Sequence, residues 1–363
     1  MPVAEYFSTD YASARDTFLA AAASARAALQ SYQLPDRHGP RGEPLTIDVA
    51  LLGAREADRG LVIISGTHGV EGFCGSGCQV GFLADRLYEA LPKSACCVLI
   101  HALNPHGFAW LRRVNEDGVD LNRNFIDFSG PLPSSASYEA LHDWLVPTDW
   151  DGKARAEADA KLKEFAEQHD TVAFQAAISG GQYTRPAGLF YGGDRPSWSA
   201  RTLRAILEQH LPPSVRHVAV LDLHTGLGPT GYGEPILIAR SKADAARARQ
   251  WYGADIRDLS GGESVSAQVV GSAAQGIEAA LPRKELTYVA LEFGTRPMLE
   301  VLTALRADHW WHAHGSGDVA ARIPIQRHMR EAFYNETPPW QAAVYGRTAD
   351  FVFRACRGLA SSG

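Results

Sequence analysis

The sequence predicts an α/β fold: a three-layer α/β/α sandwich with a mixed, largely parallel central sheet. Two observations support this fold class, because short apolar runs recur along the chain and stretches of helical pattern separate them. Several of the apolar runs are continuous rather than alternating, which is typical of strands that helices cover on both faces. Strands separated by helices in this way favour a sheet between two helical layers.

The predicted elements follow one another along most of the chain. An alanine-rich stretch predicts an N-terminal helix over residues 11–31. Strands are predicted over the apolar runs Leu45–Leu52, Leu61–Ile64, Cys97–Ala102, Val218–Leu223, Pro235–Ala239 and Tyr288–Phe293. Helices are predicted over residues 72–91, 154–169, 198–210, 242–257 and 298–308, and the tail from about residue 318 is expected to be helical as well.

Neither a repeat nor a low-complexity linker divides the 363 residues. We therefore expect a single domain over residues 1–363, with its core at about residues 45–300 and helical extensions at both ends. Residues 127–153 are rich in proline, serine and tryptophan, and we expect a long surface excursion there rather than a domain boundary.

The composition narrows the possible partners. The chain has 21% charged and 45% hydrophobic residues and a formal net charge of −6 without a basic block, so neither nucleic acid nor an anionic membrane surface is an expected partner. No stretch approaches the roughly 18 apolar residues of a membrane span, and the N-terminal residues do not resemble a signal peptide. Five cysteines without regular spacing indicate reduced thiols, so we expect a cytoplasmic protein. These features leave the oligomeric state open.

The polar residues that follow the predicted strands are the main functional signal. His68 follows one strand, Asn104 a second and His224 a third, and Glu292 lies at the end of the last apolar run. In open α/β sheets, ligands bind outside the carboxyl ends of the strands, where the loops gather. Four strand ends that carry such residues therefore predict a site at this edge of the sheet.

His68 and Glu71 lie three residues apart in the stretch SGTHGVEGF, among three glycines. This spacing places both side chains on the same side of a first helical turn, and His224 reaches them from a distant strand. Catalytic zinc commonly takes three nitrogen and oxygen ligands and keeps one position open, so the pattern predicts a zinc site. A single histidine at a strand end is more often a hydrogen-bonded loop residue. Gly69, between the two ligands, is expected to let the backbone turn sharply.

Cysteine ligands are a second possibility, because Cys74 and Cys78 follow this stretch closely. No second cysteine pair completes a four-ligand set, however. We therefore expect Cys78, Cys96 and Cys97 to be buried and to pack as small apolar side chains.

The loop over residues 108–125 collects Arg113, Asp120, Asn122 and Arg123. An arginine binds a carboxylate through two parallel hydrogen bonds, and an arginine near a metal can stabilise an oxyanion. Asp120 is well placed to accept a hydrogen bond from a ligand histidine. A solvated charged loop has the same composition, so this stretch is informative only beside the metal pattern.

Glu292 lies in the stretch YVALEFGT, between Leu291 and Phe293. A carboxylate is costly to bury there without a charged partner. A general base beside a metal has such a partner and has a use for a raised pKa. The simpler alternative is a strand-end glutamate that pairs with a lysine or an arginine.

Four stretches, taken in order, resemble the motifs of the zinc metallocarboxypeptidase superfamily: GTHGVEG, NPHG with RVNEDGVDLNRNF, LDLHTG and LEFGT. They look closest to its bacterial, carboxypeptidase-like branch near the succinylglutamate desuccinylase and aspartoacylase group, over roughly residues 45–300. The resemblance implies one zinc ion per chain, bound by His68, Glu71 and His224. It also implies that Glu292 is the base that activates the hydrolytic water.

The same resemblance implies roles for the polar loop. Arg113 matches the arginine that stabilises the oxyanion, with Arg112 as the alternative. Asn122 and Arg123 match the clamp for a substrate carboxylate. Asp120 matches the carboxylate that orients a ligand histidine.

The sequence departs from the family in two places. The substrate-capping tyrosine has no clear match, and neither Tyr232 nor Tyr252 is assigned to it. Residues 178–198 have no counterpart in the well-known digestive enzymes and predict either a loop over the site or a packed structural loop. In a loop over the site, the candidate substrate contacts are Gln182, Tyr183 and Arg185.

These observations predict a zinc-dependent hydrolase that cleaves an amide bond next to a free carboxylate, as a carboxypeptidase or an N-acyl amino acid deacylase. Its substrate is then a small peptide or an N-acyl amino acid. An esterase or lactonase with the same metal differs only in the leaving group. A catalytically degenerate, metal-free binding protein is a further alternative, but such a protein is expected to have lost a ligand or the base, and all four residues are present.

Overall fold

The computed structural model describes residues 2–259, 264, 266, 268–315, 317 and 319–361. The strands within these residues are β1 (Ala28–His38), β2 (Pro44–Gly53), β3 (Arg59–Ser65), β4 (Ala95–His101), β5 (His217–Thr230), β6 (Glu234–Leu237), β7 (Arg257–Asp258) and β8 (Glu285–Gly294). They form one sheet in the order β1-β2-β4-β3-β5-β8-β6-β7. The central strands β4, β3, β5 and β8 run parallel to one another, whereas β2 is antiparallel to β4 and β6 is antiparallel to β8. The sheet is therefore mixed with a parallel centre, as predicted.

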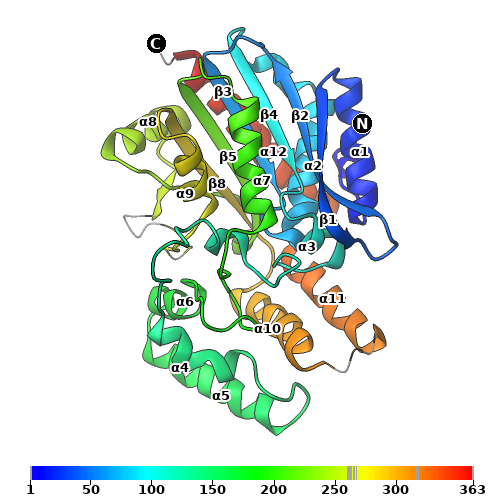
Figure 1. Ribbon diagram of the computed structural model, residues 1–363, viewed down its shortest axis with the longest axis vertical. Coiled ribbons are helices and arrows are strands. Elements are labelled where there is room, and N and C mark those ends of the chain that lie inside the picture. Colours follow the sequence, from blue (N-terminus) through cyan, green and yellow to red (C-terminus); the bar gives the residue numbers. More distant parts are fainter. Residues whose placement is uncertain are drawn as a thin grey trace.

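Helices cover both faces of this sheet (Figure 1). The α-helices are α1 (Tyr11–Ser24), α2 (Gly72–Ala84), α3 (Pro105–Trp110), α4 (Ala136–Leu145), α5 (Lys153–Gln168), α6 (Thr171–Ser179), α7 (Trp198–His210), α8 (Lys242–Tyr252), α9 (Ala273–Ala280), α10 (Met298–His314), α11 (Val319–Phe333) and α12 (Pro338–Ser361). Short 3-10 turns are η1 (Val3–Tyr6), η2 (Gly69–Glu71), η3 (Leu87–Ala90) and η4 (Leu121–Arg123). Helices α7 and α9 pack on one face of the sheet, and α1, α2, α8 and α12 pack on the other. The predicted three-layer α/β/α sandwich is confirmed.

The central strands explain why their apolar runs are continuous. In β3, Leu61 and Ile63 face the layer that contains α2 and α12, whereas Val62 and Ile64 face α7 and α9. None of these four side chains is more than 1% exposed. Because full burial of such a side chain contributes about 1.5–3 kcal/mol, both faces of the strand select apolar residues.

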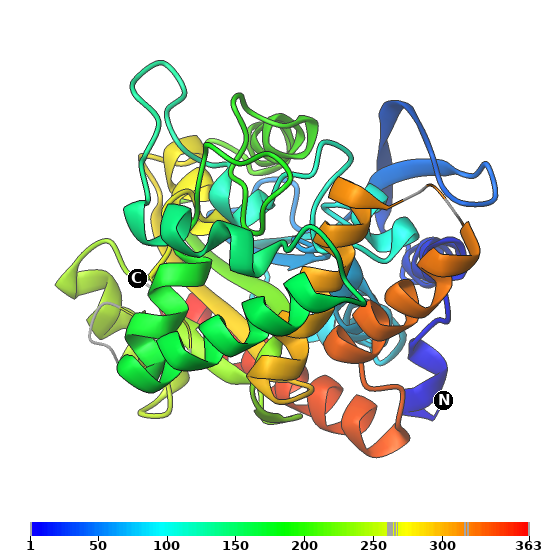
Figure 2. The ribbon, with the colours of Figure 1, turned by 90° about the horizontal axis from the view of Figure 1, so that it is seen from below.

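Helices α4, α5 and α6 form a helical lobe beyond the carboxyl edge of the sheet (Figures 1 and 2). The lobe packs against α10 and α11 around a third apolar cluster. Tyr138, Leu141 and Leu145 of α4 are buried in this cluster, so the prediction of a surface excursion over residues 127–153 is corrected. The sequence did not reveal the apolar face of α4, because prolines, serines and tryptophans surround it and obscure the helical pattern.

The N-terminal prediction is wrong in its second half. Helix α1 ends at Ser24, Arg26 adopts a positive φ of 57°, and the edge strand β1 follows. Leu34 is the one buried residue of β1, so this strand lacks the apolar alternation that normally indicates a strand.

Other boundaries differ by a few residues. Helix α2 ends at Ala84, α8 ends at Tyr252 before the short strand β7, and α10 continues to His314. The short helices α3, α6 and α9 were not predicted, because each is too brief to show a periodic pattern. Among the residues that the structure describes, no helix has both the length and the apolar character that crossing a membrane requires.

Candidate active site

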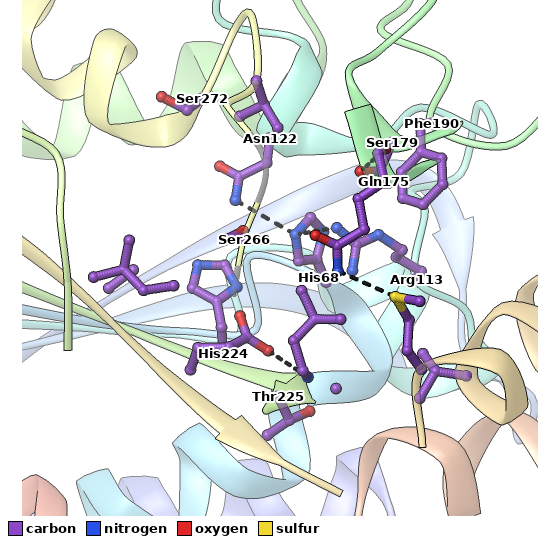
Figure 3. A pocket seen from close by; sticks show the side chains of 18 of the residues that line it. His68, Arg113, Asn122, Gln175, Ser179, Phe190, His224, Thr225, Ser266 and Ser272 are labelled. Carbon is purple, nitrogen blue, oxygen red and sulfur yellow. Dashed lines mark hydrogen bonds between the residues drawn. The ribbon is translucent and has the colours of Figure 1, made fainter. Parts of the chain in front are cut away.

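His68, Glu71 and His224 come together at the carboxyl edge of the sheet. His68 follows β3, Glu71 ends η2, and His224 lies midway along β5. Figure 3 shows His68 and His224 side by side. Each residue is buried and offers one ligand atom, and the three atoms lie within 4.8 Å of one another. This nitrogen, oxygen and nitrogen donor set fits a zinc-type ion. In the described part of the chain, it is the one cluster of this kind.

Each ligand histidine faces a buried carboxylate. His68 Nδ1 lies 3.5 Å from Asp120 Oδ1, and His224 Nε2 lies 3.0 Å from Asp222 Oδ2. Neither ring nitrogen makes a hydrogen bond of good geometry, although both are buried. Carboxylates beside ligand histidines fix the ring orientation and increase the basicity of the ligand, so both pairs fit a metal site.

Asp222 is a site residue that the sequence analysis missed. It lies two residues before His224, so both side chains point to the same face of β5. Thr67 Oγ1 donates to its Oδ1 at 2.8 Å, and the hydroxyl of Tyr288 donates to its Oδ2 at 2.7 Å. Burial acts to raise the pKa of Asp222, but His224 and these hydrogen bonds hold it below its ordinary value.

The two histidines are in opposite electrostatic environments. Burial and the nearby Arg113 lower the pKa of His68 well below its ordinary value. Burial also acts to lower the pKa of His224, but Asp222 and Glu71 raise it well above its ordinary value. The lowered pKa of His68 favours its neutral form, and the raised pKa of His224 favours its protonated form.

Arg113 lies directly against the ligand cluster. Its Nη1 donates to Glu71 Oε1 at 3.0 Å, its Nε donates to Asp120 Oδ2 at 3.0 Å, and its Nη2 lies 2.7 Å from His68 Nε2. Arg112, the alternative, pairs with Asp308 of α10 at 2.9 Å and does not line the pocket. Of the two arginines, Arg113 is therefore the one that faces the site.

Backbone contacts hold Arg113 beside the loop that carries His68 and Glu71. The amide of Gly69 donates to the Arg113 carbonyl at 3.1 Å, and the amide of Val70 donates to the Arg112 carbonyl at 2.9 Å. The side chain of Asn104, which caps α3, donates to the same Arg113 carbonyl at 3.2 Å. Asn104 thus helps to hold the loop of Arg112 and Arg113 against the loop that carries His68 and Glu71.

The glycines of this loop serve different purposes. Gly66 has a φ of +68°, a conformation that glycine adopts without steric cost. Gly69 begins the 3-10 turn η2, so the chain turns here as expected, but its φ is not positive and the turn itself does not require glycine. It is required instead because a Cβ at Gly69 would lie 2.1 Å from the carbonyl carbon of Gly107 in α3.

Glu292 of β8 lies beside His224 in the sheet, because the two residues are register partners in the parallel β5–β8 pair. Its Oε1 accepts a hydrogen bond from the Leu227 amide at 3.0 Å. Within the described chain, its recorded hydrogen-bond partner is thus a backbone amide rather than a lysine or an arginine. Burial, followed by the negative charge of Glu71, raises the pKa of Glu292 to about 8.

Asn122 is oriented by helix α9. Its Oδ1 accepts a hydrogen bond from the Ala273 amide at 2.8 Å, so its Nδ2 points toward His68, 3.4 Å from Nε2 (Figure 3). Because the oxygen of this side chain is already bonded, Asn122 presents N–H donors to the pocket. Ser272, the residue before Ala273, also lines the pocket.

Arg123 also lines the pocket but is 3% exposed and held by backbone carbonyls. Its Nε and Nη2 donate to the Ser179 carbonyl at the end of α6, and its Nη1 donates to the Asn122 carbonyl at 2.8 Å. Burial lowers the pKa of Arg123 to about 10. Its guanidinium lies 5.4 Å from the ring centroid of Phe190, and that of Arg113 lies 5.5 Å from the same ring.

Residues 178–198 form a packed structural loop. Gln182 Oε1 accepts from the Arg185 amide at 2.8 Å, Tyr183 donates to a backbone carbonyl at 2.6 Å, and the Arg185 guanidinium pairs with a glutamate of α4. None of the three lines the pocket, so their prediction as substrate contacts is corrected. Phe190 of this loop does line the pocket.

Other residues weighed in the sequence lie away from the site. Tyr232 is 43% exposed and Tyr252 is fully buried, and neither lines the pocket. All five cysteines lie in the described part of the chain, where they are free and buried, and none belongs to the ligand cluster.

The ligand cluster opens into a cavity of about 150 Å³. One apolar wall comes from the sheet side and includes Ile236, Ile238, Leu259, Tyr288 and Ala290. The other comes from the helical side and includes Phe174, Ile178, Phe190, Met298, Val301, Leu302, Leu305 and Phe333. Sequence reasoning missed both walls, because they are assembled from segments far apart in the chain and carry no motif.

The fold and the site define an α/β protein with a buried His-Glu-His cluster and a neighbouring glutamate at the carboxyl edge of its sheet. Residues 7–347 match the family described as "Protein of unknown function (DUF2817)", and the chain belongs to that family. Among curated proteins, none matches the sequence.

Several solved structures are similar to this chain. A metallo-carboxypeptidase from Burkholderia cenocepacia is 12% identical with a TM-score of 0.45, and the match covers 96% of this chain and 69% of that chain. The murein-tripeptide amidase MpaA from Escherichia coli O157 is 17% identical with a TM-score of 0.36, over 78% of this chain and 92% of that chain. A putative succinylglutamate desuccinylase/aspartoacylase from Shewanella frigidimarina is 20% identical with a TM-score of 0.36, over 85% and 73%. Two of these names, metallo-carboxypeptidase and succinylglutamate desuccinylase/aspartoacylase, are among the groups that the sequence motifs resemble.

Proposed function

We propose that this protein is a zinc-dependent hydrolase that cleaves an amide bond next to a free carboxylate, as a carboxypeptidase or an N-acyl amino acid deacylase. One observation carries the proposal: three buried ligand atoms lie within 4.8 Å of one another, and Glu292 is the strand neighbour of the ligand His224. A metal site with an adjacent carboxylate has the parts that metal-assisted hydrolysis requires.

His68, Glu71 and His224 are the proposed ligands of one zinc ion per chain. When bound, zinc polarises a carbonyl oxygen and lowers the pKa of water. Glu292 is the proposed general base, which takes a proton from the attacking water and returns it to the leaving nitrogen. Its raised pKa supports this role, because a base that is too acidic would not pick the proton up.

Arg113 is the proposed donor to the oxyanion that forms at the carbonyl oxygen. Its position supports this role, since Nη1 and Nη2 lie within 3.0 Å of atoms of Glu71 and His68. Donors fixed in advance at this point stabilise the charge that develops in the transition state.

Asn122 and Arg123 are the proposed partners of the substrate carboxylate. Asn122 contributes the amide donors that face the pocket. Of the five N–H donors of Arg123, at least three are engaged by the backbone carbonyls of Ser179 and Asn122. We therefore propose that Arg123 supplies mainly positive charge, and that Asn122 supplies the directional hydrogen bond.

Two further parts of the proposal concern alternatives and location. An esterase or lactonase would use the same residues, and no specific observation favours it or a metal-free binding protein. A cytoplasmic location is proposed because all five cysteines, each of them described, are free thiols.

The test is a comparison of matched substrates on the zinc-loaded protein. N-acyl amino acids and dipeptides are assayed beside their C-terminal carboxamides and their ester analogues. We expect hydrolysis of the amides that carry a free carboxylate and a large loss of kcat/KM for the carboxamides. Equal cleavage of carboxamides would contradict the carboxylate site, and cleavage of esters alone would make the protein an esterase.

A further inference from the structure

The helical side of the pocket forms a distinct apolar chamber. Helix α6 contributes Phe174 and Ile178, and α10 contributes Met298, Val301, Leu302 and Leu305. We refer to these six residues as the lobe chamber. Phe174, Ile178, Val301 and Leu305 are at most 5% exposed, so these wall residues are buried where the helical lobe packs against α10.

Polar groups beside the chamber already donate hydrogen bonds elsewhere. The Gln175 side chain donates through Nε2 to Met298 Sδ at 3.1 Å, which links α6 to α10 (Figure 3). Ser179 Oγ donates to the Gln175 carbonyl at 2.8 Å, and Thr225 Oγ1 donates to the Phe333 carbonyl at 2.6 Å. An anionic substrate group would therefore lose its water here, because these groups have chiefly acceptor oxygens left to offer.

In the proposed function the substrate carboxylate binds at Asn122 and Arg123, and the directional hydrogen bond from Asn122 turns it toward the other wall. Asn122 presents its amide donors to the pocket, and its oxygen is fixed at the start of α9. Ser272, next to that attachment point, lines the pocket together with Ile236 and Ala290 of the sheet side. A substrate anchored by its carboxylate at Asn122 thus places the amino acid half near the sheet wall. The lobe chamber is then left for the group on the other side of the scissile carbonyl.

We propose that the lobe chamber binds the apolar acyl group of an N-acyl amino acid, so that the preferred substrates carry an aliphatic or aromatic acyl chain larger than acetyl. This inference rests on the proposed function and favours an N-acyl amino acid deacylase over a carboxypeptidase. A peptide would bring backbone N–H and C=O groups into the chamber, where unpaired polar groups are costly to bury. A hydrocarbon chain has no such groups and gains from leaving water.

An acyl-chain series measures the proposed preference directly. The zinc-loaded protein is assayed with N-acetyl-, N-hexanoyl- and N-decanoyl-leucine and with alanyl-leucine. Each methylene that enters the chamber is expected to raise kcat/KM on the order of threefold, until the chamber is full. If acetyl-leucine or alanyl-leucine is the best substrate of the series, the proposal is overturned.

A chamber-filling variant tests the location. Leu302→Trp places a larger side chain in the chamber, and the ratio of kcat/KM for decanoyl-leucine to that for acetyl-leucine is expected to fall at least ~10-fold. Leu299→Trp is the matched control, because Leu299 lies on the same helix but is 60% exposed and does not line the pocket. An unchanged ratio in a folded Leu302→Trp protein, checked by its melting temperature, would overturn the location. Ile178→Ala gives a second measurement, since a larger chamber should shift the preference to longer chains.

Binding to metal-free protein separates this inference from the proposed function. Titration calorimetry with N-decanoyl-leucine is expected to show binding that Leu302→Trp weakens and Leu299→Trp does not. If this pattern appears while no N-acyl amino acid is hydrolysed, the chamber is supported and the proposed hydrolase function fails. If N-acetyl-leucine is hydrolysed but decanoyl-leucine neither binds nor reacts, the function stands and the chamber assignment fails.

Discussion

The hydroxyl of Tyr288 donates a 2.7 Å hydrogen bond to Asp222 Oδ2, and the same oxygen lies 3.0 Å from Nε2 of the ligand His224. Tyr288 also lines the pocket. The carboxylate of Asp222 therefore connects His224 to Tyr288, whose side chain lines the pocket. Substitution of Asp222 or Tyr288 should therefore lower the affinity for the metal without removing a proposed ligand.

Asp222→Asn is expected to lower zinc affinity about 10- to 100-fold, the usual range when a residue that orients a ligand is lost. Tyr288→Phe should have a smaller effect in the same direction, because the carboxylate stays and loses one of its hydrogen bonds. Competition with a chelator gives both affinities. Tyr252→Phe is the control, since that buried hydroxyl has no hydrogen-bond partner among the described residues and lies away from the site. Wild-type affinity in Asp222→Asn would contradict the support role.

Zinc content tests the ligand set itself. The purified protein is expected to hold about one zinc ion per chain, and His68→Ala or His224→Ala should abolish it because two remaining ligands hold zinc poorly. Cys74→Ala should keep its zinc, because this buried thiol is outside the ligand cluster. Elemental analysis of the dialysed proteins provides the measurement. Full occupancy in both histidine variants would rule the ligand assignment out.

Glu292→Gln separates metal binding from catalysis. The side chain keeps its size and its acceptor for the Leu227 amide but no longer takes up a proton. We expect zinc content to be retained and kcat to fall at least ~10²-fold, the usual scale for a positioned general base. Steady-state kinetics on the zinc-loaded variant decide this. A rate near that of the wild type would mean that another group is the base.

Gly69→Ala should destabilise the fold as well as the site. The added Cβ would lie 2.1 Å from the Gly107 carbonyl carbon, so α3 and the ligand loop would have to separate. The melting temperature of the metal-free variant is expected to fall clearly below that of the metal-free wild type. Gly130→Ala is the matched control, because nothing lies within 4 Å of the Cβ it would add. An unchanged melting temperature in Gly69→Ala, with zinc binding lost, would show that this loop shapes only the site.

His101 predicts how stability depends on pH. It is fully buried in β4, stacks on Phe18 with a centroid distance of 4.4 Å, and burial lowers its pKa from 6.5 to about 4. Between these values the unfolded chain binds a proton that the folded chain does not. The stabilisation that neutral, buried His101 contributes is therefore complete above pH 6.5. It is lost as the pH falls toward 4, and the free energy of unfolding drops by up to about 1.4 kcal/mol per pH unit.

The corresponding measurement is denaturant unfolding of the metal-free protein at several pH values. His101→Gln should be less stable than the wild type at pH 8, and the difference should narrow as the pH falls from 6.5 to 4. A difference that stays constant over this range would contradict a neutral, buried His101.

The proposed ligands and the proposed base could be singled out from sequence because each lies within a short contiguous motif, and the structure brings the three proposed ligands together. Helix α7 was predicted with both ends correct, since Ser197 caps it and its apolar spacing is regular. Strand β1 was missed, because an exposed edge strand has no apolar pattern to read. Asp222 left a weak signal, as it alternates with His224 along one strand.

The walls of the pocket could not be predicted in the same way. Ile178 and Val301 are ordinary apolar residues of two helices, and their sequences resemble those of any helix that packs on a core. What brings them together is the packing of the helical lobe against α10, which depends on contacts between distant segments. The roles of Arg112 and Arg113 also needed the structure, because neighbouring residues of one loop face opposite sides.

The register of β5 and β8 has a consequence for how this protein could be altered. His224 and Glu292 occupy the same rung of the sheet, so backbone hydrogen bonds set their separation. The helical lobe, by contrast, contributes side chains to the pocket wall and the Ser179 carbonyl, which accepts hydrogen bonds from Arg123. Its helices can therefore be exchanged for others that make a chamber of another size while the spacing of ligand and base is preserved. The sheet fixes which bond-breaking chemistry is possible, and the lobe is the replaceable part with which to engineer selectivity.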